Sequence, residues 1–212
     1  MLDALLDMLV PQRCAGCGTL GVALCANCVV AITWRPVIRD TVPGIRRVTA
    51  LGAYDGVLRR AILALKYSNA TAVGEALGAL LGQRLEGAGN VLVPVPLHPS
   101  RLRKRGYNQA ETLARGVLRG WSSEDRAPPR LAADALIRAH PTVPQSGLDH
   151  DARQANVGAA FCAGSRVLEI VDRRVVLIDD VLTTGATLRA CAAVLKRHGA
   201  AAVDACCAAI KL

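Results

Sequence analysis

The stretch at residues 175–188 constrains the fold of this chain more than any other, because it combines three local signals. Residues 175–178 are apolar and mostly β-branched, which predicts a buried central strand of a parallel sheet. Asp179 and Asp180 end this apolar run, and open α/β sheets bind ligands at the carboxyl ends of their strands. A small, hydroxyl-rich turn follows, formed by Thr183, Thr184, Gly185, Ala186 and Thr187. Apolar residues at helical spacing then predict a helix that ends before Gly199.

This arrangement predicts a binding site for a phosphorylated polyol. Backbone N–H groups and hydroxyls at a helix start bind phosphate, and the helix dipole favours the anion. The carboxylates of Asp179 and Asp180 can accept hydrogen bonds from sugar hydroxyls or help to hold a magnesium ion between phosphates. A strand–turn–helix crossover with a chance acidic pair is the alternative interpretation. The sequence contains neither a P-loop nor a Gly-x-Gly-x-x-Gly run after a strand, which disfavours nucleotide hydrolysis and dinucleotide binding.

Four cysteines near the start of the chain form a second strong motif, C-x2-C-x7-C-x2-C, made by Cys14, Cys17, Cys25 and Cys28. Two pairs of thiolates, each across a tight turn, supply the tetrahedral four-sulfur shell that zinc prefers. Because every ligand in such a shell is protein sulfur, the predicted zinc site is structural rather than catalytic. Buried structural cysteines without metal are the alternative. The remaining cysteines are expected to be small buried residues; they are Cys162, Cys191, Cys206 and Cys207.

The composition bounds the class of protein. A chain of 212 residues accommodates one ordinary domain and a small accessory module. The net charge of +9 indicates an anionic ligand or partner, such as a phosphorylated small molecule, nucleic acid or anionic lipid, with a generally basic surface as the alternative. No apolar run approaches the ~20 residues that span a bilayer. Leucines at helical spacing in residues 1–10 predict a short docking helix. Asp3 and Asp7 stand where a secretory signal requires basic residues, which disfavours such a signal. We therefore expect a cytoplasmic protein with reduced cysteines.

The other predicted elements surround the central stretch. Apolar runs predict strands at residues 46–54, 91–95, 134–139 and 200–210. Helical spacing predicts helices at residues 57–66, 72–85 and 108–118. Residues 127–130 predict a linker, and the turn-rich stretch at residues 141–156 predicts a functional lid.

A basic loop at residues 96–109 follows the predicted strand at residues 91–95. It contains Arg101, Arg103, Lys104 and Arg105. Because these side chains follow the carboxyl end of a second strand, we expect them near Asp179, where a pyrophosphate would need positive charge. A solvated basic turn is the alternative. Lys66, between two predicted helices, is expected to be an ordinary helix-end lysine, with contact between its cation and an anion as the alternative.

The central stretch resembles the phosphoribosyl pyrophosphate signature of type I phosphoribosyltransferases, in which an apolar strand, Asp-Asp and Thr-Gly-x-Thr follow one another. The chain as a whole resembles the ComF family, phosphoribosyltransferase-like proteins with an N-terminal zinc knuckle. This family is known from bacterial competence for DNA uptake and from relatives labelled amidophosphoribosyltransferases. The matching segments are the four cysteines of the C-x2-C motif and residues 58–67, 94–110, 145–148, 153–156, 160–161 and 175–188.

The resemblance implies an α/β fold with a mostly parallel sheet in residues 36–212, preceded by a zinc module in residues 1–35. It implies transfer of a phosphoribosyl group to an unidentified nitrogenous acceptor, with magnesium bound and pyrophosphate released. The implied catalytic residues are Asp179, Asp180 and Arg105. The implied ligand-binding residues are Thr183, Thr184, Gly185, Ala186 and Thr187 for the 5-phosphate, and Arg101, Arg103, Lys104, Tyr107 and Asn108 in the pyrophosphate loop. The alternative is a non-catalytic partner in DNA uptake that binds phosphoribosyl pyrophosphate or single-stranded DNA.

Overall fold

The structure is a computed structural model that describes residues 12–32, 38–39, 42–85, 90–122, 127–139 and 160–211. Two expectations lie outside these ranges: the docking helix at residues 1–10 and the lid at residues 141–156.

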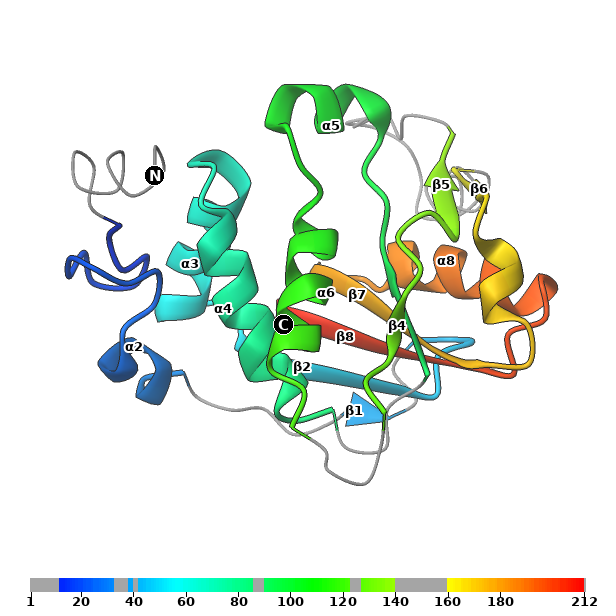
Figure 1. Cartoon of the computed structure of the whole chain (residues 1–212), viewed down its shortest axis with the longest axis horizontal. Coiled ribbons are helices and arrows are strands. Elements are labelled where there is room, and N and C mark those ends of the chain that lie inside the picture. Colours follow the sequence, from blue (N-terminus) through cyan, green and yellow to red (C-terminus); the bar gives the residue numbers. More distant parts are fainter. Residues whose placement is uncertain are drawn as a thin grey trace.

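A six-stranded sheet with the order β1-β2-β8-β7-β3-β4 forms the centre of the molecule (Figure 1). Every neighbouring pair is parallel except β1 and β2, which are antiparallel. The mostly parallel α/β architecture is therefore confirmed. The strands are β1 (Ile38–Arg39), β2 (Arg47–Ala53), β3 (Val91–Pro94), β4 (Arg130–Leu131), β7 (Arg174–Leu182) and β8 (Ala202–Ile210).

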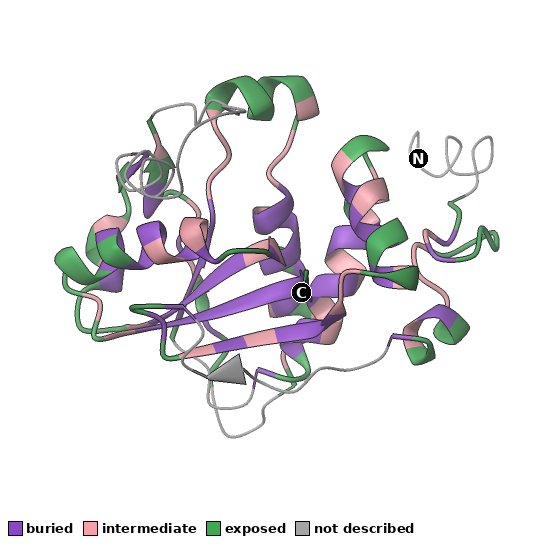
Figure 2. Cartoon of the chain, turned by 180° about the vertical axis from the view of Figure 1, so that it is seen from behind, coloured by how far each residue is buried: buried purple, intermediate pink, exposed green. Residues whose placement is uncertain are grey.

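Helices cover both faces of this sheet. The longer helices are α3 (Gly56–Tyr67), α4 (Thr71–Gly82), α6 (Gln109–Arg119) and α8 (Ala186–Arg197), and the shorter ones are α2 (Ala26–Val30), α5 (Pro99–Arg105) and the 3-10 helix η1 (Val167–Ile170). Leucines of α3, α4 and α6 share one buried cluster, while α8 contributes to the other cluster. Figure 2 shows the buried residues gathered along the sheet and the inward sides of these helices. No helix in the described ranges is long and apolar enough to cross a membrane.

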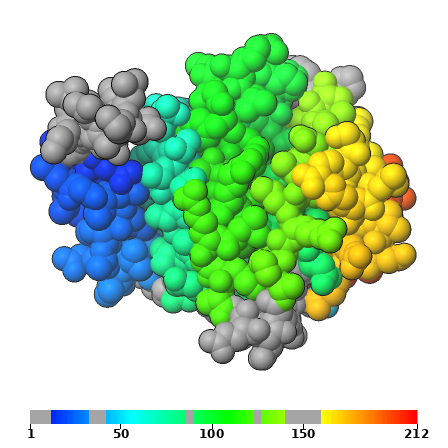
Figure 3. Space-filling model, viewed as in Figure 1, coloured from blue at the N-terminus to red at the C-terminus, as the bar shows by residue number. Residues whose placement is uncertain are grey.

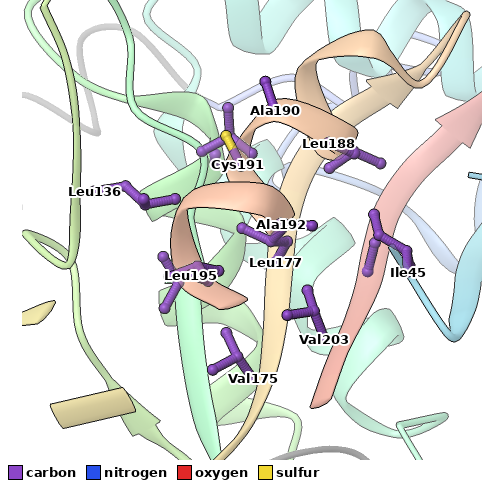
Figure 4. Packing of buried hydrophobic residues seen from close by; sticks show 14 of the residues in the cluster. Ile45, Leu136, Val175, Leu177, Leu188, Ala190, Cys191, Ala192, Leu195 and Val203 are labelled. Atoms are coloured by element: carbon purple, nitrogen blue, oxygen red, sulfur yellow. The ribbon is translucent and has the colours of Figure 1, made fainter. Parts of the chain in front are cut away.

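The central strand β7 has one apolar side chain after another because both of its faces are covered. Val175 and Leu177 belong to the cluster that includes Leu195 of α8, and Figure 4 shows these side chains together. Val176 and Ile178 belong to the cluster formed by α3, α4 and α6. The alternation of faces along a strand thus explains why a continuous apolar run predicted a central parallel strand.

Four details differ from the sequence-based expectations. The strand predicted at residues 134–139 exists as β5 (Leu136–Arg138), but it pairs antiparallel with β6 (Phe161–Ala163) in a separate two-stranded sheet. The predicted linker at residues 127–130 runs into the edge strand β4. The basic loop contains the helix α5. Cys162 is exposed, because its side chain lies on the outer face of the small sheet, whereas Cys191, Cys206 and Cys207 are buried as expected.

Candidate functional site

A cavity of about 720 Å³ lies at the carboxyl ends of β3 and β7. Its size falls within the range of ~300–1,000 Å³ that is typical of small-molecule sites. Asp179, Asp180 and Thr187 line it, together with predicted site residues from the basic segment: Arg101, Lys104, Arg105, Tyr107 and Asn108. The fold therefore gathers most of the predicted ligand-binding residues around one opening.

The acidic pair lies inside β7 rather than after it. β7 continues to Leu182 and pairs with β8 on both sides of Asp180, so both carboxylates belong to a paired strand near its end. The backbone N–H of Asp180 donates to Oδ1 of Asp179 at 2.8 Å. This hydrogen bond orients the carboxylate of Asp179 against the backbone of Asp180.

Lys66 forms an ion pair with the acidic pair, which corrects its interpretation as an ordinary helix-end lysine. Its Nζ lies 3.0 Å from Oδ2 of Asp180, and the two side chains are 21% and 16% exposed. Both residues line the cavity. The last turn of α3 therefore supplies a cation to the site.

Burial, together with the neighbouring charge of Asp180, raises the pKa of Asp179 to about 7. The N–H of Asp180 and the cations Lys66 and Arg138 act in the opposite direction and lower this pKa. Desolvation of a carboxylate disfavours its charged form, so the ligand-free site holds Asp179 at an energetic cost. A ligand that brings a cation or hydrogen-bond donors to this carboxylate would relieve that cost.

The helix α5 forms a basic wall of the cavity. Pro99 occupies the first turn, Nδ1 of His98 accepts from the N–H of Ser100, and Gly106 ends the helix with φ +81. These are start and stop signals of a helix, which the charge of the segment obscured in the sequence. Arg101, Lys104 and Arg105 line the cavity, but the described lining residues do not include Arg103.

The segment after α5 fixes this wall to the core. Asn108 caps α6 by accepting from the N–H of Ala110, and its Nδ2 donates to the carbonyl of Val95 at 3.0 Å. The hydroxyl of Tyr107 donates to the carbonyl of Leu65 in α3. Tyr107 and Asn108 thus connect the basic wall to β3 and α3, and they have a structural role besides lining the cavity.

The Thr-Gly turn forms the entry to α8 as predicted. Gly185 adopts a left-handed conformation with φ +74 at the N-cap of α8, which a side chain would strain. Thr183 and Thr184 are exposed, and Oγ1 of Thr184 accepts from the N–H of Ala186 at 3.5 Å. Of the turn residues from Thr183 on, all of which are described, Thr187 alone lines the cavity. The turn therefore lies at its margin in the absence of ligand.

Sequence reasoning missed several residues that line the cavity: Tyr67, Asn69, Gln109 and Arg138, besides the role of Lys66. Arg138 reaches the site from β5, and its guanidinium lies 5.2 Å from the centre of the Phe161 ring. Burial lowers the pKa of Arg138, and the nearby charge of Arg101 acts in the same direction. In Figure 1 the small β5–β6 sheet lies at the same end of the molecule as α5. No local pattern in the sequence indicated that this sheet would face the acidic pair.

The four predicted zinc ligands form a second cluster. The sulfur atoms of Cys14, Cys17, Cys25 and Cys28 lie within 4.8 Å of one another, and the Cys17 and Cys25 sulfurs are 3.6 Å apart. Tetrahedral zinc with Zn–S bonds of ~2.3 Å separates its sulfur ligands by ~3.8 Å. The cluster is therefore compatible with a structural zinc site.

Backbone donors and neighbouring thiols polarise this cluster. Burial would raise the pKa of Cys14, but hydrogen bonds from backbone N–H groups, including Gly16 at 3.4 Å and Cys25 at 3.3 Å, lower it to about 6. Burial and the other three thiols raise the pKa of Cys28 to about 12. A thiolate at one cysteine thus disfavours deprotonation of the neighbouring cysteines. A bound metal cation would offset this repulsion, as expected of a set of metal ligands.

The cysteine module is anchored to the helix that carries Lys66. Nε of Arg60 in α3 donates to the carbonyl of Gly16 at 2.7 Å, between Cys14 and Cys17 in the sequence. Gly16 is packed so closely that an added Cβ would lie 2.5 Å from the Cys28 sulfur. Figure 3 shows the module, in blue, directly against the cyan segment that contains α3.

Comparisons with known proteins found a matching domain family, related sequences and a similar solved structure. The sequence profile of the phosphoribosyl transferase domain matches residues 107–212, which is half of the chain. The chain is 32% identical over 177 residues to the DNA utilization protein YhgH of Escherichia coli K12, covering 78% of this chain and 72% of that protein. It is 31% identical over 165 residues to competence protein F of Haemophilus influenzae, covering 74% and 69%. Among solved structures, an allosteric regulatory enzyme of purine biosynthesis aligns with a TM-score of 0.43 at 20% identity, over 65% of this chain and 26% of that one.

Proposed function

The chain belongs to the ComF family of phosphoribosyltransferase-like proteins, and from this premise we propose that its cavity binds phosphoribosyl pyrophosphate together with magnesium. The observation that carries the proposal is the meeting of an acidic pair and a basic wall in one cavity. Five basic side chains line it against two carboxylates. A polyanionic sugar phosphate matches both parts, because its phosphates need cations and its hydroxyls need acceptors.

Each part of the cavity has a proposed role. The turn from Thr183 to Thr187 and the N-terminus of α8 would take the 5-phosphate, since free N–H groups and the helix dipole favour anions there. Asp179 and Asp180 would accept hydrogen bonds from the ribose hydroxyls or help to hold the magnesium ion. Bound magnesium would neutralise charge on the pyrophosphate group.

The proposed reaction is displacement of pyrophosphate from C1 by a nitrogen nucleophile. The C1–O bond to pyrophosphate breaks, the leaving group keeps the electron pair, a C1–N bond forms and the nitrogen loses a proton. Arg101, Lys104 and Arg105 would stabilise the charge that builds on the leaving pyrophosphate. The acceptor is not identified by the lining residues.

A non-catalytic function is the second candidate, because two relatives are named for DNA utilization and competence. In this version the protein binds phosphoribosyl pyrophosphate or single-stranded DNA as a partner in DNA uptake. The basic side chains on the exposed part of α5 would then contact phosphates of the strand.

We also propose that the four-cysteine cluster holds one structural zinc ion. The spacing of the sulfur atoms and the N–H groups directed at Cys14 support it. When bound, zinc would stabilise the four thiolates and fix the fold of the module.

Calorimetric titration with phosphoribosyl pyrophosphate and magnesium tests the binding proposal. The helix α5 offers a matched comparison: Lys104→Gln removes a cation that lines the cavity, whereas Arg103→Gln removes one that does not. We expect saturable binding to the unmodified protein. Lys104→Gln should lower the affinity at least threefold, or by about 0.7 kcal/mol, whereas Arg103→Gln should change it by no more than about twofold. Absence of binding to the unmodified protein would refute the proposal.

Pyrophosphate release separates the two candidate functions. An enzyme should release pyrophosphate in a manner that depends on an added nitrogenous acceptor. A binding partner should release none and should bind single-stranded DNA with an affinity that falls steeply with salt.

A further inference from the structure

We propose that Gln109 is a positioning residue that holds Arg105 in the geometry with which it meets the pyrophosphate part of a ligand. The inference deepens the proposed function and rests on it. It concerns a residue that lines the cavity and acts through a neighbouring arginine. The basic side chains of α5 lie in different environments.

Arg105 is the member of this group that the surrounding structure fixes. Arg101, Arg103 and Lys104 are exposed, whereas Arg105 is half-buried. Its Nη1 donates to Oε1 of Gln109 at 2.5 Å. Its guanidinium also lies over the ring of Tyr67, 5.6 Å from the centroid. Arg105 is therefore held between a buried amide and an aromatic ring at the wall of the cavity.

The amide of Gln109 is buried at a cost to the fold. Gln109 is the first residue of α6 and is 2% exposed. Its Nε2 is buried and makes no hydrogen bond of normal geometry with the described residues, although the side chain approaches the hydroxyl of Tyr107. A buried donor without a partner destabilises a protein, and an apolar side chain of similar shape removes that cost. Arg105, which would lose its acceptor, is only half-buried and can be hydrated instead. Stability therefore does not explain the amide, but its contact with Arg105 does.

Positioning of this kind raises affinity because it reduces the side-chain conformational entropy that is lost on binding. A free arginine loses rotamer freedom when it contacts a phosphate, and a pre-organised one loses less. Without Gln109, Arg105 would keep its charge but sample more orientations. Pyrophosphate affinity should therefore fall even though no cation has been removed.

The experiment uses the full chain and inorganic pyrophosphate with magnesium as the probe, titrated by calorimetry. We expect Gln109→Met to weaken binding about tenfold, which corresponds to about 1.4 kcal/mol, while the melting temperature stays equal or rises. In an Arg105→Met background, Gln109→Met should change the affinity less than about twofold, because the group it positions is gone. Gln83→Met, at an exposed position after α4, is the control for the chemical change.

Three results would overturn the inference. One is unchanged affinity in Gln109→Met. Another is an equal loss of affinity with and without Arg105, which would indicate a general structural role. The third is a Gln109→Met variant that melts lower or fails to fold, because the amide would then be needed for stability.

The outcomes also separate this inference from the proposed function. Pyrophosphate binding that depends on Gln109, without binding of phosphoribosyl pyrophosphate, would retain the inference and reject the function. Binding of phosphoribosyl pyrophosphate with no dependence on Gln109 would retain the proposed function and reject the inference about Gln109.

Discussion

Replacing Asp179 by Asn should stabilise the ligand-free protein and weaken its ligand binding. The carboxylate of Asp179 is desolvated next to Asp180, and its pKa is raised from 3.8 to about 7. Asn keeps the size of the side chain and an oxygen that can accept from the N–H of Asp180, a contact of 2.8 Å. The substitution therefore removes a charge that the empty site disfavours and little else.

The size of this stabilisation and its dependence on pH follow from the difference between the pKa of Asp179 in the folded and unfolded states. The gap between 3.8 and about 7 corresponds to about 4 kcal/mol when both folded and unfolded states are ionised. Because the side chain keeps partial contact with water, we expect about half of this, roughly 2 kcal/mol. A raised carboxylate pKa destabilises the folded state as pH rises from about 4 to about 7. The difference between Asn variant and unmodified protein should thus be near zero at pH 4 and reach its plateau above pH 7.

Urea denaturation at a series of pH values between 4 and 8.5 measures this difference. Asp134→Asn, a carboxylate outside the lining of the cavity, is a control for the loss of one charge. A stability difference that does not change with pH, or an Asp179→Asn variant that is less stable above pH 7, would refute the assignment of a desolvated, charge-coupled carboxylate.

Other substitutions test neighbouring parts of the account. Lys66→Met removes a cation that lies 3.0 Å from Asp180 and that also lowers the pKa of Asp179. The pKa of Asp179 should therefore rise, and the pH at which ligand binding reaches half of its maximum should move upward in calorimetry. Gly185→Val should lower both ligand affinity and stability, the latter by about 2 kcal/mol in urea denaturation, because φ is +74 and the new Cβ would lie 2.8 Å from Val42. Cys28→Ser should reduce zinc from about one ion per chain by metal analysis and lower the melting temperature; an unmodified protein without zinc would contradict the metal proposal.

The parts of the fold that were predictable are those whose signals are local. The apolar run before Asp179 predicted a strand covered on both faces, and the structure confirms this for β7. The cysteine spacing likewise predicted a cluster, because short turns bring each pair together without help from the rest of the chain. The helix α5 was missed although Pro99 and Gly106 mark its two ends, since its row of like charges was interpreted as a basic loop.

The site residues that lie at the ends of parallel strands were predicted, and those supplied by elements distant in the sequence were missed. Asp179 lies near the carboxyl end of β7, and the basic segment follows the neighbouring parallel strand β3, so their meeting could be inferred from topology. Arg138 arrives from the small antiparallel sheet, and Lys66 reaches Asp180 from the end of a helix. Neither contact leaves a periodic pattern in the sequence, because each depends on how whole elements pack.

The central claim is that this cavity, through its acidic pair, binds phosphoribosyl pyrophosphate. The most direct test is the affinity of the Asp179→Asn, Asp180→Asn double variant for phosphoribosyl pyrophosphate with magnesium, compared with that of the unmodified protein. Loss of charge-assisted hydrogen bonds should weaken binding by roughly 2 kcal/mol or more, about thirtyfold, in a protein that still melts cooperatively. Equal affinity in the two proteins would contradict the site and the function derived from it.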